Sequence, residues 1–123
     1  DDMRWDIKNF EVKILSCWSI INYKHAYNAA HIHANALISS AYYVEAPDKC
    51  GDIIFDDPRP GATIKKGPYS SVSEWNQGNI RITPKPGLLI MFPSYLTHHV
   101  QPNMSEKERT IISFNLDVAR KNT

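Results

Sequence analysis

Residues 79–92, NIRITPKPGLLIMF, decide the fold class, because they contain two strand patterns separated by a turn. Polar and apolar residues alternate from Asn79 to Thr83, which is typical of a half-buried strand. Two prolines and a glycine within residues 84–87 then turn the chain, and the apolar run of residues 88–92 follows as a buried strand. The same period of two recurs on both sides of this stretch.

About eight strands are expected in all, at short spacings broken by glycine and proline, and no segment has a convincing helical period. Residues 59–78 differ, because they are polar, contain glycine and are long enough for a mobile loop or lid. The sequence therefore predicts a single all-β domain over residues 1–123, built as a jelly roll or a small barrel. The expected strands cover residues 11–21, a segment around His31, and residues 36–45, 52–56, 79–83, 88–92, 100–102 and 109–117.

The composition excludes several classes of protein. A length of 123 residues with 42% hydrophobic and 22% charged residues is typical of one globular domain and not of a disordered chain. The 14 Lys and Arg residues barely exceed the 13 Asp and Glu residues, so we expect no nucleic-acid partner and no polybasic membrane contact. No apolar run approaches the roughly 18 residues that a membrane span requires.

The two cysteines and the first residues bear on the cellular setting. Cys17 lies in an apolar run and is expected to be a small buried side chain, and Cys50 precedes a probable turn at Gly51. Two cysteines are too few for a disulfide framework, so a reducing, cytoplasmic environment is predicted. No secretory signal is visible, and a chain that begins Asp1-Asp2 is expected to be a trimmed product or part of a longer protein.

Four of the five histidines occur in two tight groups. His31 and His33 are two residues apart, so on a strand both imidazoles point to the same face, as two ligands of one metal require. Adjacent strand residues point opposite ways, so at most one of His98 and His99 faces a shared site. An isolated His-x-His pair more often marks an exposed strand, and histidine spacing alone leaves both interpretations open. His25 is expected to be a surface residue.

Arg109 begins the last expected strand, on the same face as Ser113 and Asn115. If that face is interior, a guanidinium and a hydroxyl lie among apolar side chains. A buried arginine is costly unless it meets an anion, and a bound dicarboxylate would supply one. The alternative is a surface strand on which Arg109 pairs with Glu106 or Glu108.

Six features follow one another along the chain: His31-x-His33, Ser40–Val44, Gly51–Phe55, Pro86–Pro93, His98–Pro102 and Arg109. In this order they resemble the 2-oxoglutarate/iron(II)-dependent oxygenases, above all the small oxygenases of bacteria and marine phages. The similarity covers residues 15–117 and is most distinctive between residues 86 and 109. It implies a double-stranded β-helix, a cupin-like jelly roll, that holds one Fe(II) at one end and uses 2-oxoglutarate as cosubstrate.

The resemblance also implies roles for single residues. His31 and His98 match the two histidines of the family's metal site, while His33 occupies the position of its carboxylate ligand. Arg109 and Tyr43 match the residues that hold the far carboxylate of 2-oxoglutarate, for which a guanidinium offers a planar, charge-assisted fork. The implied site has His31, His33 and His98 as metal ligands and Arg109, Tyr43 and Ser113 as cosubstrate-binding residues.

The departure at His33 leaves three functions to compare. The first is an Fe(II)- and 2-oxoglutarate-dependent oxygenase that hydroxylates an unidentified substrate and releases succinate and CO2, since three imidazoles still leave three positions on the metal open. The second is a three-histidine cupin-type dioxygenase independent of 2-oxoglutarate, which leaves Arg109 without a role. The third is a non-catalytic, metal-stabilised binding or virion module.

Two further expectations concern the surroundings of the site. Asp52 or Asp56 could in principle supply the missing carboxylate, but their spacing does not match the motif. Within the loop of residues 59–78, Tyr69 and Trp75 make that segment the predicted substrate-facing lid.

Overall fold

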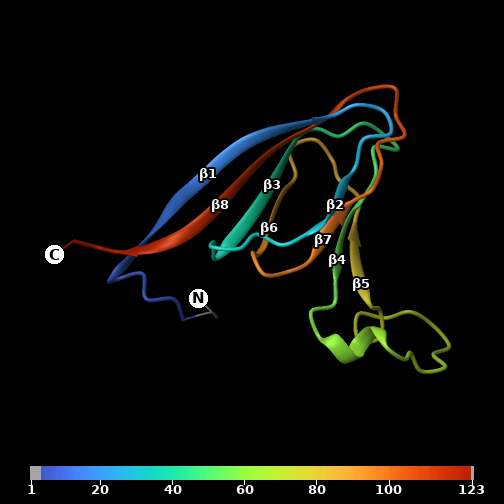
Figure 1. The fold of residues 1–123 in the computed structure, drawn as a ribbon, viewed down its shortest axis with the longest axis horizontal. Helices are drawn as coiled ribbons and strands as arrows, with labels where there is room; N and C mark the ends of the chain where they lie inside the picture. The colour runs from blue at the N-terminus through green and yellow to red at the C-terminus, as the bar shows by residue number, and fades with distance from the viewer. Residues whose placement is uncertain (1–3, 123) are drawn as a thin grey trace.

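The computed structural model describes residues 4–122 and contains eight strands and one short 3₁₀ helix, η1 (Figure 1). The elements in chain order are β1 (Phe10–Asn22), β2 (Asn28–His31), β3 (Ile38–Glu45), β4 (Ile53–Asp56), η1 (Pro60–Thr63), β5 (Asn79–Ile82), β6 (Leu89–Pro93), β7 (His98–Val100) and β8 (Arg109–Arg120).

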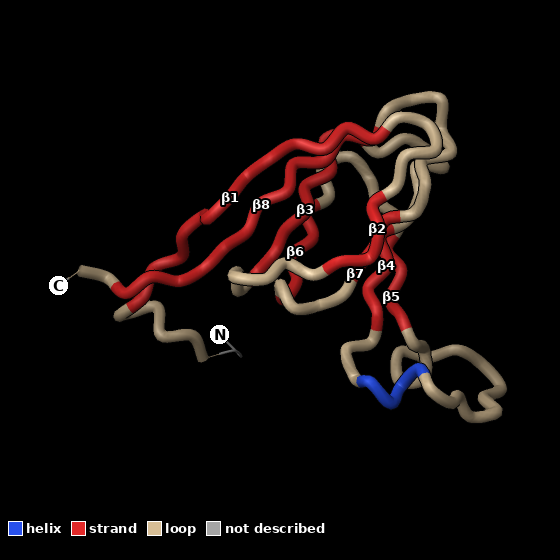
Figure 2. The backbone as a smooth tube through the Cα atoms, viewed as in Figure 1, coloured by secondary structure: helices blue, strands red, loops and turns tan. Residues whose placement is uncertain are grey.

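The strands form two four-stranded antiparallel sheets, in the orders β1-β8-β3-β6 and β2-β7-β4-β5. Neighbours in both sheets are mostly distant in sequence, as in a jelly roll. Loops from both sheets gather at one end of the molecule, and the sheets diverge toward the other end (Figure 2). The predicted all-β jelly roll is therefore confirmed.

Most strand bounds agree with the sequence, but the two histidine segments differ from expectation. β7 covers His98–Val100 and not residues 100–102, because β4 sets its register by pairing Phe55 with His98 and Ile53 with Val100. β2 ends at His31, so His33 lies two residues beyond the strand. His31 and His33 therefore do not share one strand, and the prediction that they do was wrong.

The core lies between the sheets and follows the alternation predicted for the last strand. Arg109 and Ile111 of β8 are buried, whereas Ile112 between Ile111 and Ser113 is exposed. Full burial of one large aliphatic or aromatic side chain contributes about 1.5–3 kcal/mol. The largest buried apolar side chains come from both sheets, namely Tyr43, Ile53, Ile54, Phe55, Ile90, Phe92 and Ile111.

The prediction that Cys17 is buried was wrong, because its side chain is exposed. It lies three residues before Ile20 on β1 and therefore points to the opposite face of the sheet. Cys50 is buried, and both thiols are free.

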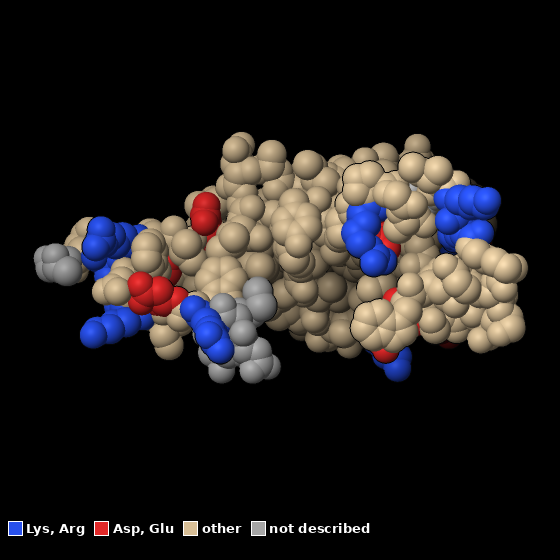
Figure 3. All heavy atoms as spheres, turned by 90° about the horizontal axis from the view of Figure 1, so that it is seen from below, with Lys and Arg blue, Asp and Glu red and all other residues tan. Residues whose placement is uncertain are grey.

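The surface carries no large patch of one charge on the face shown in Figure 3, as expected from a net charge of +1. Viewed from below, charged side chains lie toward the two ends of the molecule, and the surface between them carries few charges (Figure 3). Within the described part of the chain, no helix is long and apolar enough to cross a membrane.

Candidate functional site

A cavity of about 310 Å³ lies between the two sheets and contains most of the sequence-predicted site. His31, His33 and His98 line one part of it, which we call the histidine end. The other lining residues come from strands of both sheets: Trp18, Ile20, Asn28, Ser40, Ala41, Tyr43, Ile53, Phe92, Val100, Ile111 and Ser113.

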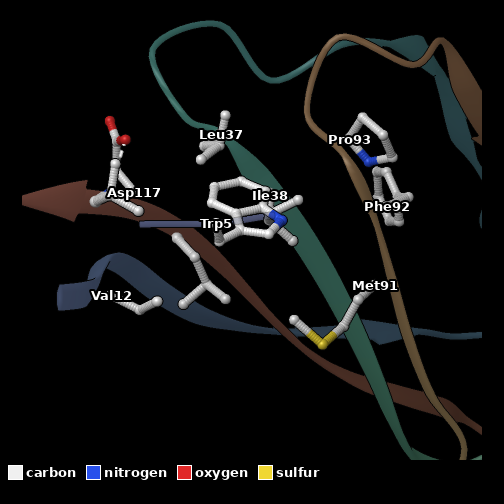
Figure 4. Close-up of a pocket in the computed structure, with 10 residues that line it drawn as sticks. Trp5, Val12, Leu37, Ile38, Met91, Phe92, Pro93 and Asp117 are labelled. Carbon is white, nitrogen blue, oxygen red and sulfur yellow. Dashed lines mark hydrogen bonds between the residues drawn. The ribbon is translucent and has the colours of Figure 1, made fainter. Parts of the chain in front are cut away.

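A larger groove of about 440 Å³ lies elsewhere and is almost wholly apolar. There the indole of Trp5 lies over the sheet beside Val12, Ile38 and Met91 (Figure 4). The one charged side chain in its lining is Asp117, so the groove lacks the set of titratable groups that chemistry requires. We therefore place the functional site in the smaller cavity.

The three predicted metal ligands lie together. One potential ligand atom from each of His31, His33 and His98 lies within 4.8 Å of the other two. Antiparallel pairing of β2 with β7 places His31 directly opposite His98. A backbone hydrogen bond of 2.9 Å from the His33 amide to the Ser94 carbonyl brings the third ring to the same place.

Two of these rings have a fixed orientation. The Nδ1 atom of His31 lies 2.7 Å from the carbonyl oxygen of Ala29, and that of His98 lies 2.9 Å from the carbonyl oxygen of Leu96. A histidine whose Nδ1–H donates to a carbonyl keeps a lone pair on Nε2, which is the usual arrangement of a metal-bound imidazole.

Burial favours the neutral form of two of the imidazoles, those of His98 and His33. It lowers the pKa of His98 to about 4, despite the opposing effect of the hydrogen bond to Leu96. Burial and the nearby His31 also lower the pKa of His33. Phe92 packs edge-on against His98, with ring centroids 4.6 Å apart, and supplies part of this apolar environment. Neutral imidazole is the form that binds metal.

The other candidate ligands lie outside the cluster. His99 is half-buried and does not line the cavity, as its strand neighbour His98 requires. His25 is an exposed loop residue with φ +70°. Among residues 4–122, neither Asp52 nor Asp56 nor another carboxylate joins the three histidines.

Arg109 lies near the cavity in a fully buried region that we call the arginine end, and its side chain is 0% exposed. Its Nη1 donates to the carbonyls of Cys50 and Gln101, and its Nε lies 3.4 Å from the Asn22 side-chain oxygen. Within the described residues Nη2 has no partner, so one guanidinium nitrogen is left for an external anion, and not the fork of two nitrogens that we expected. The alternative of a surface pairing with Glu106 or Glu108 is wrong, because Arg109 is fully buried and bonds to backbone carbonyls.

Tyr43 completes the arginine end. It is 0% exposed, and its hydroxyl has no partner among the described residues. Burial raises the pKa of Tyr43 to about 12, so the hydroxyl stays a hydrogen-bond donor. Ser113 is buried in the same cavity lining, as its place on the face of Arg109 predicts.

Sequence reasoning missed the residues that hold Arg109 in place. Asn103 is 0% exposed and donates to the backbone carbonyls of Asn22 and Lys107. At Gly51 (φ +89°), an added Cβ would lie 2.5 Å from the Gln101 carbonyl oxygen, so only glycine allows this close crossing. These contacts join segments that are far apart in sequence, and no local pattern indicates them.

The predicted lid does not line the cavity. The loop between β4 and β5 forms a separate hollow of about 290 Å³ that includes Tyr69 and Trp75. The loop begins directly after Asp56, one residue beyond Phe55, the pairing partner of His98. It therefore leaves the sheet close to the histidine end.

A protein-family model described as "Putative 2OG-Fe(II) oxygenase" matches residues 16–115, which is most of the chain. The chain belongs to this family. Fe(II) and 2-oxoglutarate are the cofactors that the family name implies, and both were predicted. Among curated proteins none matches the chain.

Three solved structures of other proteins have the same fold. An oxidoreductase of the 2OG-Fe(II) oxygenase family from Burkholderia pseudomallei is 14% identical, with a TM-score of 0.68 over 87% of this chain and 45% of its own. The non-heme alpha ketoglutarate dependent epimerase SnoN from nogalamycin biosynthesis is 14% identical, with a TM-score of 0.64 over 90% and 52%. A Pseudomonas putida prolyl-4-hydroxylase is 16% identical, with a TM-score of 0.56 over 86% and 52%. The chain thus spans about half the length of these structures.

The residues that line the cavity, together with Arg109 beside it, fit both cofactors of the family. Imidazole nitrogen suits Fe(II), and three histidine nitrogens converge at one end. At the other end, the unpaired donors Arg109 Nη2 and Tyr43 Oη are costly while buried and suit a carboxylate.

Proposed function

We propose that the chain is an Fe(II)- and 2-oxoglutarate-dependent dioxygenase that hydroxylates an unidentified primary substrate and releases succinate and CO2. The main support is the pair of unpaired buried donors, Arg109 Nη2 and Tyr43 Oη, in a fold whose cavity also contains three histidines. A metal-binding module alone has no use for a buried cation without a carboxylate partner.

The residues divide the work between the two ends. His31, His33 and His98 hold the iron, and Arg109 and Tyr43 hold the far carboxylate of 2-oxoglutarate. When bound, iron and 2-oxoglutarate together supply the oxidative decarboxylation of the cosubstrate by O2 that drives hydroxylation. The protein contributes ligand charge, orientation and exclusion of water.

Each residue at the arginine end donates through one atom. Arg109 donates from Nη2 alone, because Nη1 is already bound to two backbone carbonyls. Tyr43 donates from its hydroxyl, which stays protonated because its pKa is about 12. Ser113 is the third proposed contact, from the same cavity lining.

A three-histidine dioxygenase that acts without 2-oxoglutarate is the second candidate. It is favoured by one observation, namely that no carboxylate among residues 4–122 joins the histidine cluster. Three neutral imidazoles leave the metal with one negative charge fewer than two histidines and a carboxylate. This candidate gives no role to the donors at the arginine end.

Two weaker assignments belong to the same proposal. The loop of residues 59–78 acts as a lid over the histidine end, which is supported by where the chain leaves β4. A cytoplasmic location is supported by the free thiols of Cys17 and Cys50.

Anaerobic titration of the protein with Fe(II), with and without 2-oxoglutarate, tests the proposal. We expect a visible metal-to-ligand charge-transfer band only when both are present. Iron binding without this band would favour the second candidate, and turnover of O2 without 2-oxoglutarate would establish it. Absence of iron binding would contradict both.

A further inference from the structure

The three histidines of the cluster are not fixed equally. His31 and His98 each have a ring nitrogen bound to a backbone carbonyl, at 2.7 Å and 2.9 Å. In both cases the acceptor belongs to the residue two positions earlier, Ala29 or Leu96. A metal-bound histidine with such a partner keeps its tautomer and ring orientation, and it is a stronger base.

His33 has no such partner. Within residues 4–122, no hydrogen bond joins its ring to another group, and its ring contacts are with other rings. Its centroid lies 6.0 Å from Trp18 and 5.2 Å from His98, on which it stacks at an angle of 11°. Ring stacking limits tilt but does not select which nitrogen bears the proton.

The backbone around His33 is fixed although the ring is not. The His33 amide donates to the Ser94 carbonyl at 2.9 Å. The residue lies after the end of β2 and shortly before Asn35, which has φ +68°. The Cα atom is therefore held near the cluster, while rotation of the side chain breaks no hydrogen bond.

We propose that His33 is a dissociable ligand of the bound metal, whereas His31 and His98 are permanent ones. The inference rests on the proposed function, because it requires a metal at the cluster. When the His33 ring rotates away, two histidines keep the ion in place and one more position opens to an external ligand. His33 occupies the motif position of the usual carboxylate ligand. At that position the metal therefore has a neutral ligand that dissociates, in place of a negative ligand that stays bound.

Metal affinities of single variants provide the first test. Anaerobic calorimetric titration with Co(II), a stable substitute for Fe(II), would be made on wild type, His31→Ala, His33→Ala and His98→Ala. Loss of a carbonyl partner typically changes metal affinity 10- to 100-fold. We therefore expect the loss for His33→Ala to be about 10- to 100-fold smaller than that for His31→Ala or His98→Ala. His99→Ala is the matched control, since His99 adjoins His98 but lies outside the cluster, and it should bind as wild type does.

Proton exchange in unmodified protein provides the second test, so the inference does not depend on the folding of variants. In the Co(II)-loaded protein, paramagnetic NMR resolves the ring N–H protons of metal-bound histidines. We expect two slowly exchanging N–H signals, from His31 and His98, and a third that exchanges rapidly with water or is broadened.

Each outcome has a separate meaning. Three equally protected N–H signals, or a His33→Ala loss as large as the other two, would overturn the dissociable ligand while leaving the metal site intact. Wild-type protein that binds neither Co(II) nor Fe(II) would overturn the proposed function and the inference with it.

Discussion

The histidine end of the cavity and the arginine end beside it hold their functional side chains in the same way but in different surroundings. Both fix a nitrogen-bearing side chain with backbone carbonyls, Ala29 and Leu96 at the histidine end, Cys50 and Gln101 at the arginine end. The histidine end is graded in exposure, with His31 exposed, His33 half-buried and His98 buried. The arginine end is closed, since Arg109 and Tyr43 are each 0% exposed.

This difference in burial determines how much each end destabilises the protein when no ligand is bound. Neutral imidazoles carry no charge that burial has to desolvate, so they cost little at neutral pH when no ligand is bound. A buried guanidinium with an unpaired nitrogen is costly, and binding of a carboxylate removes that cost. Changes at the arginine end should therefore affect both folding stability and cosubstrate binding, whereas changes at the histidine end should affect mainly the metal.

Arg109→Ala should have the largest effect. It leaves the carboxylate of 2-oxoglutarate without its cation and the carbonyls of Cys50 and Gln101 without a donor. We expect the affinity for 2-oxoglutarate to fall more than about a hundredfold in Arg109→Ala. In Arg109→Lys the affinity should fall less, because the charge remains. The measurement is 2-oxoglutarate titration of the iron-loaded protein.

Iron affinity of the same variants is the control. It should stay close to wild type, because Arg109 is not part of the histidine cluster. His31→Ala should show the reverse pattern, with iron affinity lost and folding stability retained. Unchanged 2-oxoglutarate binding by Arg109→Ala would contradict the division into two ends.

Gly51→Ala should have the second largest effect, and the chain offers a matched control in Gly87→Ala. Both glycines have positive φ, +89° and +83°, so alanine is strained at either position by about 1–2 kcal/mol. Only at Gly51 does the new Cβ also meet backbone, 2.5 Å from the Gln101 carbonyl oxygen. We expect the free energy of unfolding to fall by about 2–4 kcal/mol for Gly51→Ala and less for Gly87→Ala.

The two glycine variants should also differ in function. Displacement of the Gln101 carbonyl moves an acceptor of Arg109, so Gly51→Ala should weaken 2-oxoglutarate binding. Gly87 has no atom near the added Cβ within the described structure, and its variant should bind normally. Equal unfolding free energies for the two variants would show that the crossing at Gly51 adapts without cost.

The sequence predicted the fold well, because alternation along strands reports directly which face is buried. The last strand is the clearest case, where burial of Arg109 and Ile111 and exposure of Ile112 follow the pattern. The predicted burial of Cys17 was wrong for a related reason. Apolar residues lie on both faces of β1, so the sequence there does not alternate between polar and apolar. Exposed side chains there include Ile14, Leu15 and Ile21.

The site was only partly predictable. The residues near the cavity could be chosen from motifs, but the contacts that hold them could not. Arg109 depends on carbonyls at positions 50 and 101, and these reach it through pairing of strands distant in sequence. His33 converges with His31 through a loop anchored by Ser94, and not through the strand geometry that was assumed.

The stability of the metal-free protein should depend on pH through His98. Its pKa is about 4 in the folded protein and about 6.5 in an unfolded chain. Between these values the unfolded state binds a proton that the folded state does not, so stability falls as pH decreases from about 6.5 to about 4. We expect this contribution to be on the order of 1–2 kcal/mol.

Chemical unfolding of wild type and His98→Gln at several pH values in this window isolates the contribution. The stability difference between the two proteins should shrink as pH falls. His25→Gln is the control, because His25 is exposed, and it should follow the wild-type curve. Parallel curves for wild type and His98→Gln would contradict the lowered pKa.

Tyr43→Phe should have the smallest effect and should change stability and binding in opposite directions. The hydroxyl has no partner among the described residues of the free protein, so its removal abolishes an unsatisfied buried group. We therefore expect the free energy of unfolding to stay equal or to rise slightly. Binding of 2-oxoglutarate loses one neutral hydrogen bond and should weaken by about 0.5–1.5 kcal/mol.

Thermal unfolding and 2-oxoglutarate titration of this one variant decide whether Tyr43 belongs to the arginine end in function as well as in position. A fall in stability would mean that the hydroxyl already has a partner in the free protein. Unchanged cosubstrate binding would leave Arg109 as the only proven contact with the carboxylate. The loss should also be independent of pH between about 6 and 9, since a group with a pKa of about 12 remains protonated throughout this range. A loss that shrinks toward high pH would instead show that Tyr43 ionises when the cavity is filled, because a phenolate no longer donates to the carboxylate.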